Sequence, residues 1–568
     1  MHVARVRRVH KGKEYVSVLL RQSYREGGRV KHRTLASLTA LPPATIDVIE
    51  RSLKGERLVP AGEALRIVRS LPHGHVAAIL AMLRGLGLER LLDRRPSRQR
   101  DLATALIVAR ILAPASKLAT ARGLGATTLA AELGVEGATE DELYGTLDWL
   151  LARQATVERA LARRHLAPGA PALLDVTSTW MEGRCCPLAR HGYSRDHRPD
   201  RPQVVFGLTT DVEGRPLAVE AFAGNTADPA TLEAQLGKMQ AAGLGEVILV
   251  GDRGMLTSAR IERLRELGGI EWVSALRAPA IKRLVAEGHL QLSLFDERDL
   301  VEIASPDFPG ERLVVCRNPV LAAERTRKRD ELLDATDADL SRIAAAVAAG
   351  RLVREAAIAL RVGRVRDRHR MAKHFILDIG EGRFAFRRDE DAIAAEAALD
   401  GLYVIRTSVG PDVLAAPDVV LAYKRLSAVE RDFRVLKGRD LEVRPVRHWR
   451  EDRVRAHLFL CLLAAYVRWH LERAWAPLLF RDEAPPERTD VVAPPGRSVA
   501  ARGKDARHLT AEGLPVHGFG SLLAELGTLT RNRVAVGAPD APTVEILSEP
   551  TPLQARALEL ANMSPLAE

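Results

Sequence analysis

The order of apolar runs between residues 170 and 277 restricts the possible folds of this chain more than any other feature. Short β-rich runs predict strands at residues 172–175, 204–209, 217–222, 246–252 and 272–276. Helical patterns cover residues 228 to about 243 and 258–267, and the first begins with Asp228 as N-cap and Pro229 at the first helical position. The sequence therefore predicts three strands in a meander, followed by helix, strand, helix and strand.

This order resembles the ribonuclease H-like fold, in which the first and fourth strands lie side by side and parallel. The first and fourth predicted strands both end in an aspartate, Asp175 and Asp252. Open α/β sheets place their ligand sites at the carboxyl ends of parallel strands, so we expect both carboxylates in one site. The predicted fold class is α/β, with a ribonuclease H-like mixed sheet flanked by helices.

The charge of the chain favours a polyanionic partner. The formal net charge is +11, and residues 1–33 hold ten Lys or Arg against two Glu. Such clustering is typical of a segment that contacts phosphates. An arginine-rich composition produces a basic chain by itself, so charge alone leaves both explanations open.

A predicted helix around Glu430 carries two different stripes. Spacings of four and three residues give one core-facing apolar stripe, formed by Ala422, Leu426, Val429, Phe433 and Leu436. A second stripe carries Tyr423, Glu430 and Lys437, because seven residues bring a helix back to nearly the same side. Such a carboxylate can complete a metal site while the phenol and the ammonium hold phosphates. An ordinary solvated heptad face has the same spacing.

Two acids on strand ends and one on a helix suit phosphodiester chemistry. That chemistry uses two hard cations, and magnesium prefers a few carboxylates together with water and substrate oxygens. The segments concerned are Leu174-Asp-Val-Thr-Ser-Thr, Gly224-Asn-Thr-Ala-Asp-Pro-Ala-Thr, Val250-Gly-Asp-Arg-Gly-Met and Val429-Glu-Arg-Asp-Phe-Arg-Val-Leu-Lys437.

In this order the segments resemble those of bacterial insertion-sequence transposases of the DDE type. The most similar group has a Tyr-Arg-Glu-Lys signature around its catalytic glutamate and a mostly β insertion before it. Glu430 stands 178 residues after Asp252, which leaves room for such an insertion. The resemblance covers about residues 170–470.

The resemblance implies a role for each matching residue. Asp175, Asp252 and Glu430 would be the catalytic acids and would bind two Mg²⁺ or Mn²⁺ ions. Tyr423 and Lys437 would contact DNA phosphates near the scissile bond.

Two further positions bear on DNA contact. The signature arginine is missing, because Leu426 stands three residues after the tyrosine and Arg425 one position earlier. Arg434, one turn after Glu430, is the candidate substitute. In the basic and aromatic segment 444–449, His448 would either contact a phosphate or cap a turn.

The implied function is transposition of DNA. Water would attack a phosphodiester at the end of a mobile element, and the freed 3′ hydroxyl would then attack target DNA. The partners would be double-stranded DNA at the element ends and the target, held by a homodimer that pairs two ends. A metal-dependent nuclease of the same fold without strand transfer is one alternative, and a catalytically inactive DNA-binding derivative is another.

The length of 568 residues predicts several domains. The helical stretch before the sheet either binds DNA ends or serves as a scaffold, and periodicity does not decide between them. We expect a basic β-hairpin arm at 1–60, an all-α region at 61–168, the first part of the catalytic core at 169–277, an α+β insertion subdomain at 278–415, the rest of the core at 416–475 and a linker with a C-terminal region at 476–568.

Other signals are assigned no catalytic role. Cys185 and Cys186 lack the CxxC spacing of zinc sites, and Asp211 and Asp400 stand at predicted turns. GxxxxGK, HExxH and GxSxG motifs are absent from the sequence, which argues against an ATPase, a zinc protease and a serine hydrolase. Four cysteines cannot form a disulfide framework, and the longest apolar run, 458–467, is too short to cross a bilayer. We therefore expect a cytoplasmic, nucleoid-associated protein that does not contact membranes.

Overall fold

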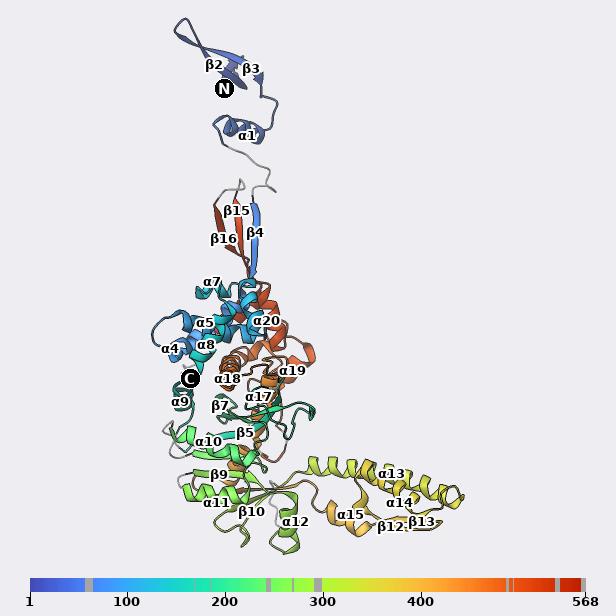
Figure 1. Cartoon of the computed structure of the whole chain (residues 1–568). Helices are drawn as coiled ribbons and strands as arrows, with labels where there is room; N and C mark the ends of the chain where they lie inside the picture. Colours follow the sequence, from blue (N-terminus) through green and yellow to red (C-terminus); the bar gives the residue numbers. More distant parts are fainter. Residues whose placement is uncertain are drawn as a thin grey trace. The chain divides into compact units, whose positions relative to one another are not determined.

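The computed structural model describes residues 1–56, 65–167, 169–183, 185–241, 247–267, 270–290, 299–486, 490–493, 495–536 and 542–562 (Figure 1). The chain forms two compact units, Met1–Leu71 with Thr530–Glu549 and Pro72–Leu529 with Pro550–Glu568. The expected boundaries at residues 60 and 168 lie outside the described residues. The expected helix end near Gly243 and strand start at Glu246 lie outside them as well.

The first unit begins with a three-stranded antiparallel sheet of β1 (His2–His10), β2 (Lys13–Glu26) and β3 (Arg29–Ser37), followed by α1 (Pro43–Leu53). The predicted hairpin is present as β2 and β3. Its turn uses Gly27 and Gly28 at positive φ, which glycine adopts without strain. β1 adds one strand to the predicted hairpin. The sequence did not predict this strand, because its many basic residues obscure the two-residue period of a strand.

A second sheet of this unit corrects the prediction that residues 61–168 are all-α. β4 (Leu65–Pro72) pairs in the order β16-β15-β4 with β15 (Thr530–Val536) and β16 (Thr543–Leu547). The partners of β4 come from the far end of the chain, so no local pattern around residue 65 reveals the pairing.

The remainder of the predicted all-α stretch is helical. It contains α3 (Gly74–Gly85), α4 (Leu88–Leu92), α5 (Arg98–Leu112), α6 (Lys117–Gly123), η1 (Leu124–Ala126), α7 (Leu129–Leu133), α8 (Glu140–Leu151) and α9 (Gln154–His165). Thr139 and Glu142 form a capping box at the start of α8. α18 (Glu451–Ala474) packs against α3, α5 and α8, so these helices share one hydrophobic core with the sheet.

No single helix of the described residues is long and apolar enough to cross a membrane. The bent pair Arg98–Leu112 and Lys117–Ala126 satisfies that criterion together, by length and composition only.

An eight-stranded mixed sheet lies at the centre of the second unit, in the order β10-β11-β14-β9-β8-β5-β6-β7. Its strands are β5 (Pro171–Trp180), β6 (Gln203–Thr210), β7 (Pro216–Ala223), β8 (Val247–Gly251), β9 (Ile270–Ala275), β10 (Leu300–Ile303), β11 (Arg312–Arg317) and β14 (Leu402–Thr407). The predicted meander is confirmed as β5, β6 and β7, and β8 pairs with β5 in parallel. α10 (Asp228–Ala241) and α11 (Ser258–Leu267) occupy the predicted positions between the strands.

Helices cover both faces of this sheet. Leu174 and Val176 of β5 pack with apolar side chains of α10 and α11, whereas Leu173 belongs to the main core with α17 (Leu426–Lys437) and α18. Side chains alternate between the faces of a strand, so Asp175 and Thr177 share the face of Leu173. The catalytic candidate on β5 therefore points to the α17 side.

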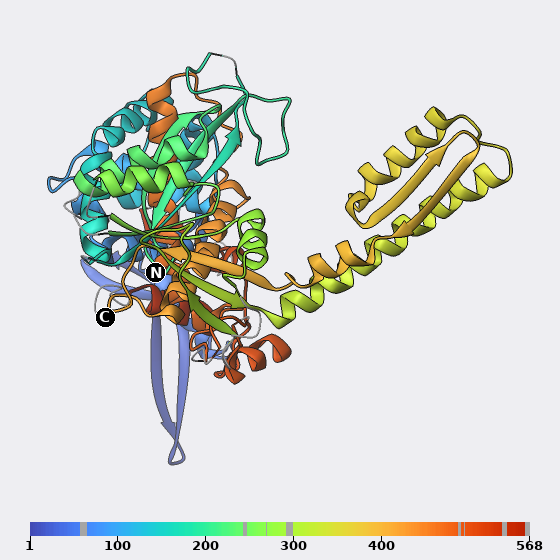
Figure 2. The same ribbon diagram turned by 90° about the horizontal axis from the view of Figure 1, so that it is seen from below.

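Residues 278–415, expected as one inserted subdomain, divide into two parts. β10, β11 and β14 lengthen the core sheet beyond β9, where β14 pairs antiparallel with β9, and α12 (Ala278–Ala286) packs near them. A separate core holds α13 (Pro319–Ala348), α14 (Glu355–His369), η2 (Ala372–His374), β12 (Phe375–Gly380), β13 (Arg383–Arg388) and α15 (Glu390–Ala397) (Figure 2). The predicted hairpin is present as β12 and β13.

The C-terminal region contains more regular structure than the predicted linker. After α16 (Ala416–Lys424), α17, α18 and η3 (Ala476–Leu478) come α19 (Val499–Arg507), α20 (Phe519–Gly527) and α21 (Pro552–Asn562). α20 and α21 both pack against α3. This end of the chain therefore closes the helical part of the second unit.

Candidate active site

Asp175 and Asp252 are brought together by the parallel pairing of β5 with β8. Leu174 pairs with Gly251, so the next residue of each chain segment is one of the two acids. Asp252 Oδ1 accepts hydrogen bonds from the backbone N–H groups of Gly254, at 2.9 Å, and Met255, at 2.7 Å. Asp175 Oδ1 accepts the N–H of Val176 at 2.7 Å. Local backbone groups thus orient both carboxylates.

The sequence predicts that the first strand ends at Asp175. In the structure, β5 continues to Trp180. β6 remains paired with β5 over this whole stretch, from Asp175 opposite Leu208 to Trp180 opposite Gln203. Only β8, on the other side, stops at Gly251. Asp175 therefore lies in mid-strand, at the point where its parallel neighbour ends.

The predicted single helix around Glu430 is two helices, α16 and α17, with a break at Arg425. The apolar stripe on α17 is confirmed, because Leu426, Val429, Phe433 and Leu436 are buried. Phe433 packs edge-on against Phe206 of β6, with ring centroids 5.6 Å apart, and fixes α17 over the sheet. Tyr423 lies at the end of α16, so the seven-residue spacing does not place it on the helix of Glu430.

Tyr423 and the three acids nevertheless lie near enough to influence one another electrostatically. Burial and the carboxylates of Asp252 and Glu430 raise the pKa of Asp175 to about 7. Burial raises the pKa of the Tyr423 phenol, and the charges of Asp252, Asp175 and Glu430 raise it further. Like charges close together favour protonated forms, so the site concentrates negative charge. Tyr423 thus lies within the electrostatic influence of the acids, although it belongs to α16.

The donor chemistry of this site fits a divalent cation. Three carboxylates that repel one another provide the hard oxygen ligands that Mg²⁺ and Mn²⁺ bind, and a cation would relieve the repulsion. Glu430 is exposed on α17, whereas Asp175 and Asp252 are half-buried. Among the described residues, no three His, Cys, Asp or Glu side chains are close enough to form a ready metal site. Joint coordination therefore requires side-chain movement, for which exposed Glu430 has the room.

Lys437 is anchored beside the acids by three partners. Its Nζ forms an ion pair with Asp196 at 2.7 Å and donates to Thr177 Oγ1 at 2.9 Å and to the Ser178 carbonyl at 3.1 Å. Thr177 follows Asp175 by two residues on the same face of β5. Burial lowers the pKa of Lys437, and the bond to Asp196 opposes that shift.

Asp196 is a residue of this site that the sequence does not reveal. It lies in the segment after β5 and also forms an ion pair with Arg444. Its side chain is 2% exposed. The run Ser194-Arg195-Asp196-His197 is polar without any periodic signal, so no feature of the sequence separates Asp196 from an ordinary loop acid.

The two weaker DNA-contact candidates differ in position. Arg434 is exposed one turn after Glu430 on α17. His448 lies against helices instead, with ring centroids 6.0 Å from Tyr144 of α8 and 5.2 Å from His457 of α18. Burial lowers the pKa of His448 to about 3, so its imidazole is neutral at neutral pH. Arg434 thus shares the helix of the acids, and His448 belongs to a different cluster.

The two acids assigned to turns have structural partners. Asp211 Oδ1 accepts the backbone N–H groups of Glu213 and Arg215, at 3.0 and 2.8 Å. Asp400 forms an ion pair with Arg329 at 2.6 Å. These contacts agree with the local roles that the sequence predicts for both aspartates.

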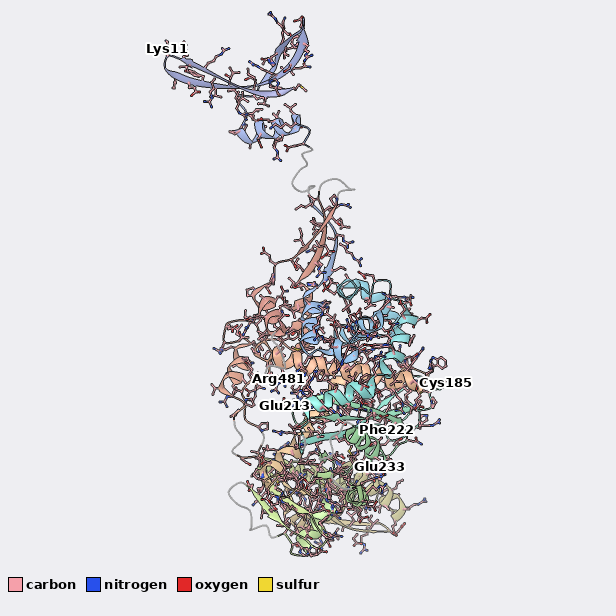
Figure 3. The ribbon with its side chains drawn as sticks, turned by 90° about the vertical axis from the view of Figure 1, so that its left-hand side faces the viewer. Lys11, Cys185, Glu213, Phe222, Glu233 and Arg481 are labelled. Atoms are coloured by element: carbon pink, nitrogen blue, oxygen red, sulfur yellow. The ribbon has the colours of Figure 1, made fainter. Side chains whose placement is uncertain are left out.

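The opposite face of α17 lines a pocket of about 310 Å³. Its residues include Asp432 of α17, Trp469 of α18, and Glu213 and Arg481, which are labelled in Figure 3. Burial raises the pKa of Asp432 to about 8. Asp432 is two residues from Glu430 but faces away from it, which makes it a matched control for the acids of the site.

Comparison with known families finds two matching domains. Residues 3–61 match the N-terminal domain of IS1634 family transposases, and residues 173–467 match the transposase DDE domain. The second match covers more than half of the chain and contains Asp175, Asp252, Tyr423, Glu430 and Lys437. No curated protein matches the chain. The chain belongs to the DDE transposases of insertion sequences.

Proposed function

We propose that this transposase cleaves DNA at the ends of its element and joins the freed 3′ ends to target DNA, with Asp175, Asp252 and Glu430 as its catalytic acids. The observation that carries the proposal is the placement of Asp175 beside Asp252 where β8 ends next to β5, at a point where burial and the charges of Asp252 and Glu430 raise the pKa of Asp175. Acids concentrated in this way are typical of sites that bind metal ions or transfer protons.

The carboxylates of Asp175, Asp252 and Glu430 would hold Mg²⁺ or Mn²⁺. A divalent cation, once bound, activates the attacking oxygen and neutralises the leaving one, and two ions serve both ends of the reaction. The backbone N–H groups of Val176, Gly254 and Met255 fix one oxygen of each aspartate and so orient the carboxylates before DNA arrives.

Tyr423 and Lys437 would position the DNA backbone on either side of the acids. Because the pKa of Tyr423 is raised, its Oη keeps its proton at neutral pH and can donate a hydrogen bond to a phosphate oxygen. Lys437 keeps the end of α17 close to β5 through Thr177 and Asp196, which places its ammonium two residues along β5 from Asp175. Arg434 would contact a phosphate one helical turn from Glu430.

Several basic surfaces support double-stranded DNA as the partner. The β1–β3 sheet is mostly exposed and includes Lys11 at the β1–β2 turn (Figure 3). On α14, Arg361, Arg364 and Arg366 are exposed, and within the described part of the chain no carboxylate lies within ion-pair distance of them. When an exposed Lys or Arg without a carboxylate partner binds a DNA phosphate, the DNA releases a bound counterion, and this release favours binding. Transposition pairs two element ends in one complex, so we propose that a homodimer holds them.

Replacing Glu430 with Gln tests the catalytic assignment. We expect the variant to bind a duplex of the element end with affinity close to that of the wild type, and to lose cleavage in Mg²⁺. The amide keeps the shape of the side chain but not its charge. Asp432→Asn, on the opposite face of the same helix, should retain cleavage. Undiminished cleavage by the Glu430 variant would remove the assignment.

A further inference from the structure

A buried group of positive and imidazole side chains lies at the junction of α5, α6 and α18. Arg110 of α5 is 6% exposed, Lys117 of α6 is 2% exposed and His457 of α18 is 5% exposed. His448, from the segment between α17 and α18, adjoins them with its ring 5.2 Å from that of His457. We call these four residues the Arg110 cluster.

The Arg110 cluster has few polar partners. Arg110 Nη2 donates to the carbonyl of Ala115 at 3.1 Å, and His457 Nε2 lies 3.2 Å from the carbonyl of Val443. His457 Nδ1 is buried without a hydrogen-bond partner. Across the described ranges, no carboxylate comes within 4 Å of Arg110 or Lys117. The cluster therefore contains buried cations without a counter-charge.

The other buried cations of this protein show what is missing. Of the described residues, six Lys or Arg are buried, and the four outside the cluster all have a carboxylate partner. The pairs are Arg329 with Asp400, Arg406 with Glu311, Arg468 with Glu472 and Lys504 with Glu483. A buried charge without a partner is destabilising, because nothing replaces the hydration that it loses. Arg110 cannot escape this cost by losing its proton.

The neighbouring groups respond to the same excess of positive charge. Burial and the charge of Arg110 lower the pKa of Lys117 to about 7. Burial, Lys117 and Arg110 lower the pKa of His448 to about 3, and burial with Arg110 lowers that of His457 well below its usual range. Both imidazoles are therefore neutral at neutral pH. His457 donates its single N–H to the Val443 carbonyl, whereas His448 can donate its N–H to another acceptor.

We infer that the Arg110 cluster binds an oxyanion of the phosphate type, which supplies the missing counter-charge. Guanidinium, ammonium and neutral imidazole groups are donors to phosphate oxygens, and only the anion balances the charge. The adjoining segment carries exposed Arg447, Arg450 and Trp449, the last 65% exposed. A DNA backbone phosphate or a free phosphate provides the same chemistry. The DNA source rests on the proposed function, and the free source does not.

Thermal unfolding of the full chain tests the site. Wild type and Lys117→Met are compared at equal ionic strength in chloride and in increasing inorganic phosphate. At about pH 6, below the pKa of Lys117 of about 7, Lys117→Met removes an unpaired charge, so the variant should melt above the wild type in chloride. If free phosphate binds, the melting temperature of the wild type rises with phosphate concentration, and that rise is reduced in the variant.

Lys504→Met is the matched control. Lys504 is 5% exposed, and its Nζ donates to the carbonyls of Ala476 and Leu479 and pairs with Glu483 at 2.7 Å. Removing this satisfied charge should lower the melting temperature and leave any phosphate response as in the wild type. A Lys117 variant that is destabilised in chloride in the same way as the Lys504 variant would overturn the inference.

Binding to a duplex of arbitrary sequence identifies the source of the oxyanion. If a DNA phosphate enters the cluster, Lys117→Met reduces the slope of log affinity against log salt by about one unit. An unchanged slope together with a phosphate response of the wild type assigns the site to a free anion. If the wild type shows no response to phosphate and Lys117→Met does not change the salt slope, the inference is overturned. If the wild type does not cleave DNA but shows the phosphate response or the change in salt slope, the proposed function is removed and this site remains.

Discussion

Asp175 combines two demands that oppose each other, a place in a packed sheet and a negative charge. Burial raises its pKa to about 7 from an ordinary value of 3.8, and Asp252 and Glu430 add to the shift. Its proton therefore stabilises the fold below about pH 4, and this stabilisation is lost as the pH rises through about 7. Above that pH the ionised site favours a bound cation over the empty state.

Asp175→Asn should consequently make the chain more stable than the wild type at pH 8 without divalent ions, by at most about 4 kcal/mol. The difference should shrink towards pH 4, where the wild-type carboxyl is protonated. Mg²⁺ should stabilise the wild type at pH 8 and leave the variant nearly unchanged. Denaturant unfolding across this pH range measures both effects.

Asp432 provides the control for this experiment, since burial raises its pKa as well, to about 8. Asp432→Asn should show a pH dependence of the same sign. It should keep the response to Mg²⁺, because Asp432 faces the pocket on the other side of α17. A loss of the Mg²⁺ response in this variant would contradict the assignment of the metal ligands.

At the scale of elements, periodicity predicted which residues of a helix or strand are buried. It did not predict where one helix ends and the next begins, or how strands pair. The apolar stripe of α17 follows from spacing alone, and its buried residues are those predicted. No sequence signal marks the helix break at Arg425, because the residue is neither Gly nor Pro. Its φ and ψ also remain in the right-handed helical region. β5 similarly continues past Asp175 because of its pairing with β6, a tertiary contact that the apolar run 172–174 does not contain.

The packing of α17 should control cleavage through Glu430. Phe433→Ala removes a side chain that is 6% exposed and packs on Phe206, and should destabilise the chain by about 3–5 kcal/mol. Because Glu430 moves with the helix, cleavage measured well below the melting temperature should fall as well. Phe480→Ala, at a side chain that is 44% exposed, should change both much less. Full cleavage by a folded Phe433 variant would show that α17 does not position Glu430.

The exposed arginines of α14 should contribute to DNA affinity through charge. Replacing Arg361, Arg364 and Arg366 with Gln should reduce the salt slope of duplex binding by up to about 3 units, without a change in sequence preference. Replacing three exposed arginines of the same part of the chain that already have carboxylate partners should reduce the slope less. These control residues are Arg327, Arg342 and Arg383, paired with Glu331, Asp339 and Asp378. Equal slopes for the two triple variants would argue against an α14 contact.

For the whole molecule, the sequence predicted the strands of the central sheet up to β9. It did not predict the strands that extend this sheet or the sheet that contains β4. The meander follows from the order of strands and turns, and the parallel pairing of β5 with β8, which brings Asp175 next to Asp252, was implied by the fold that this order resembles. β10, β11 and β14 extend the same sheet, and β4 pairs with β15, through contacts between distant segments. Long-range edge pairing leaves no periodic pattern of its own. Asp196 was missed for the same reason, because its importance comes from Lys437 and Arg444.

The central claim is that three acids on separate elements form one centre for joining DNA. Its most direct test is the rate at which a pre-cleaved element end with a free 3′ hydroxyl is joined to plasmid DNA in Mg²⁺. We expect joined products from the wild type and Asp432→Asn, and none above background from Asp252→Asn or Glu430→Gln. Cutting without joining by the wild type would indicate a nuclease. Joining at the wild-type rate by Glu430→Gln would contradict the claim.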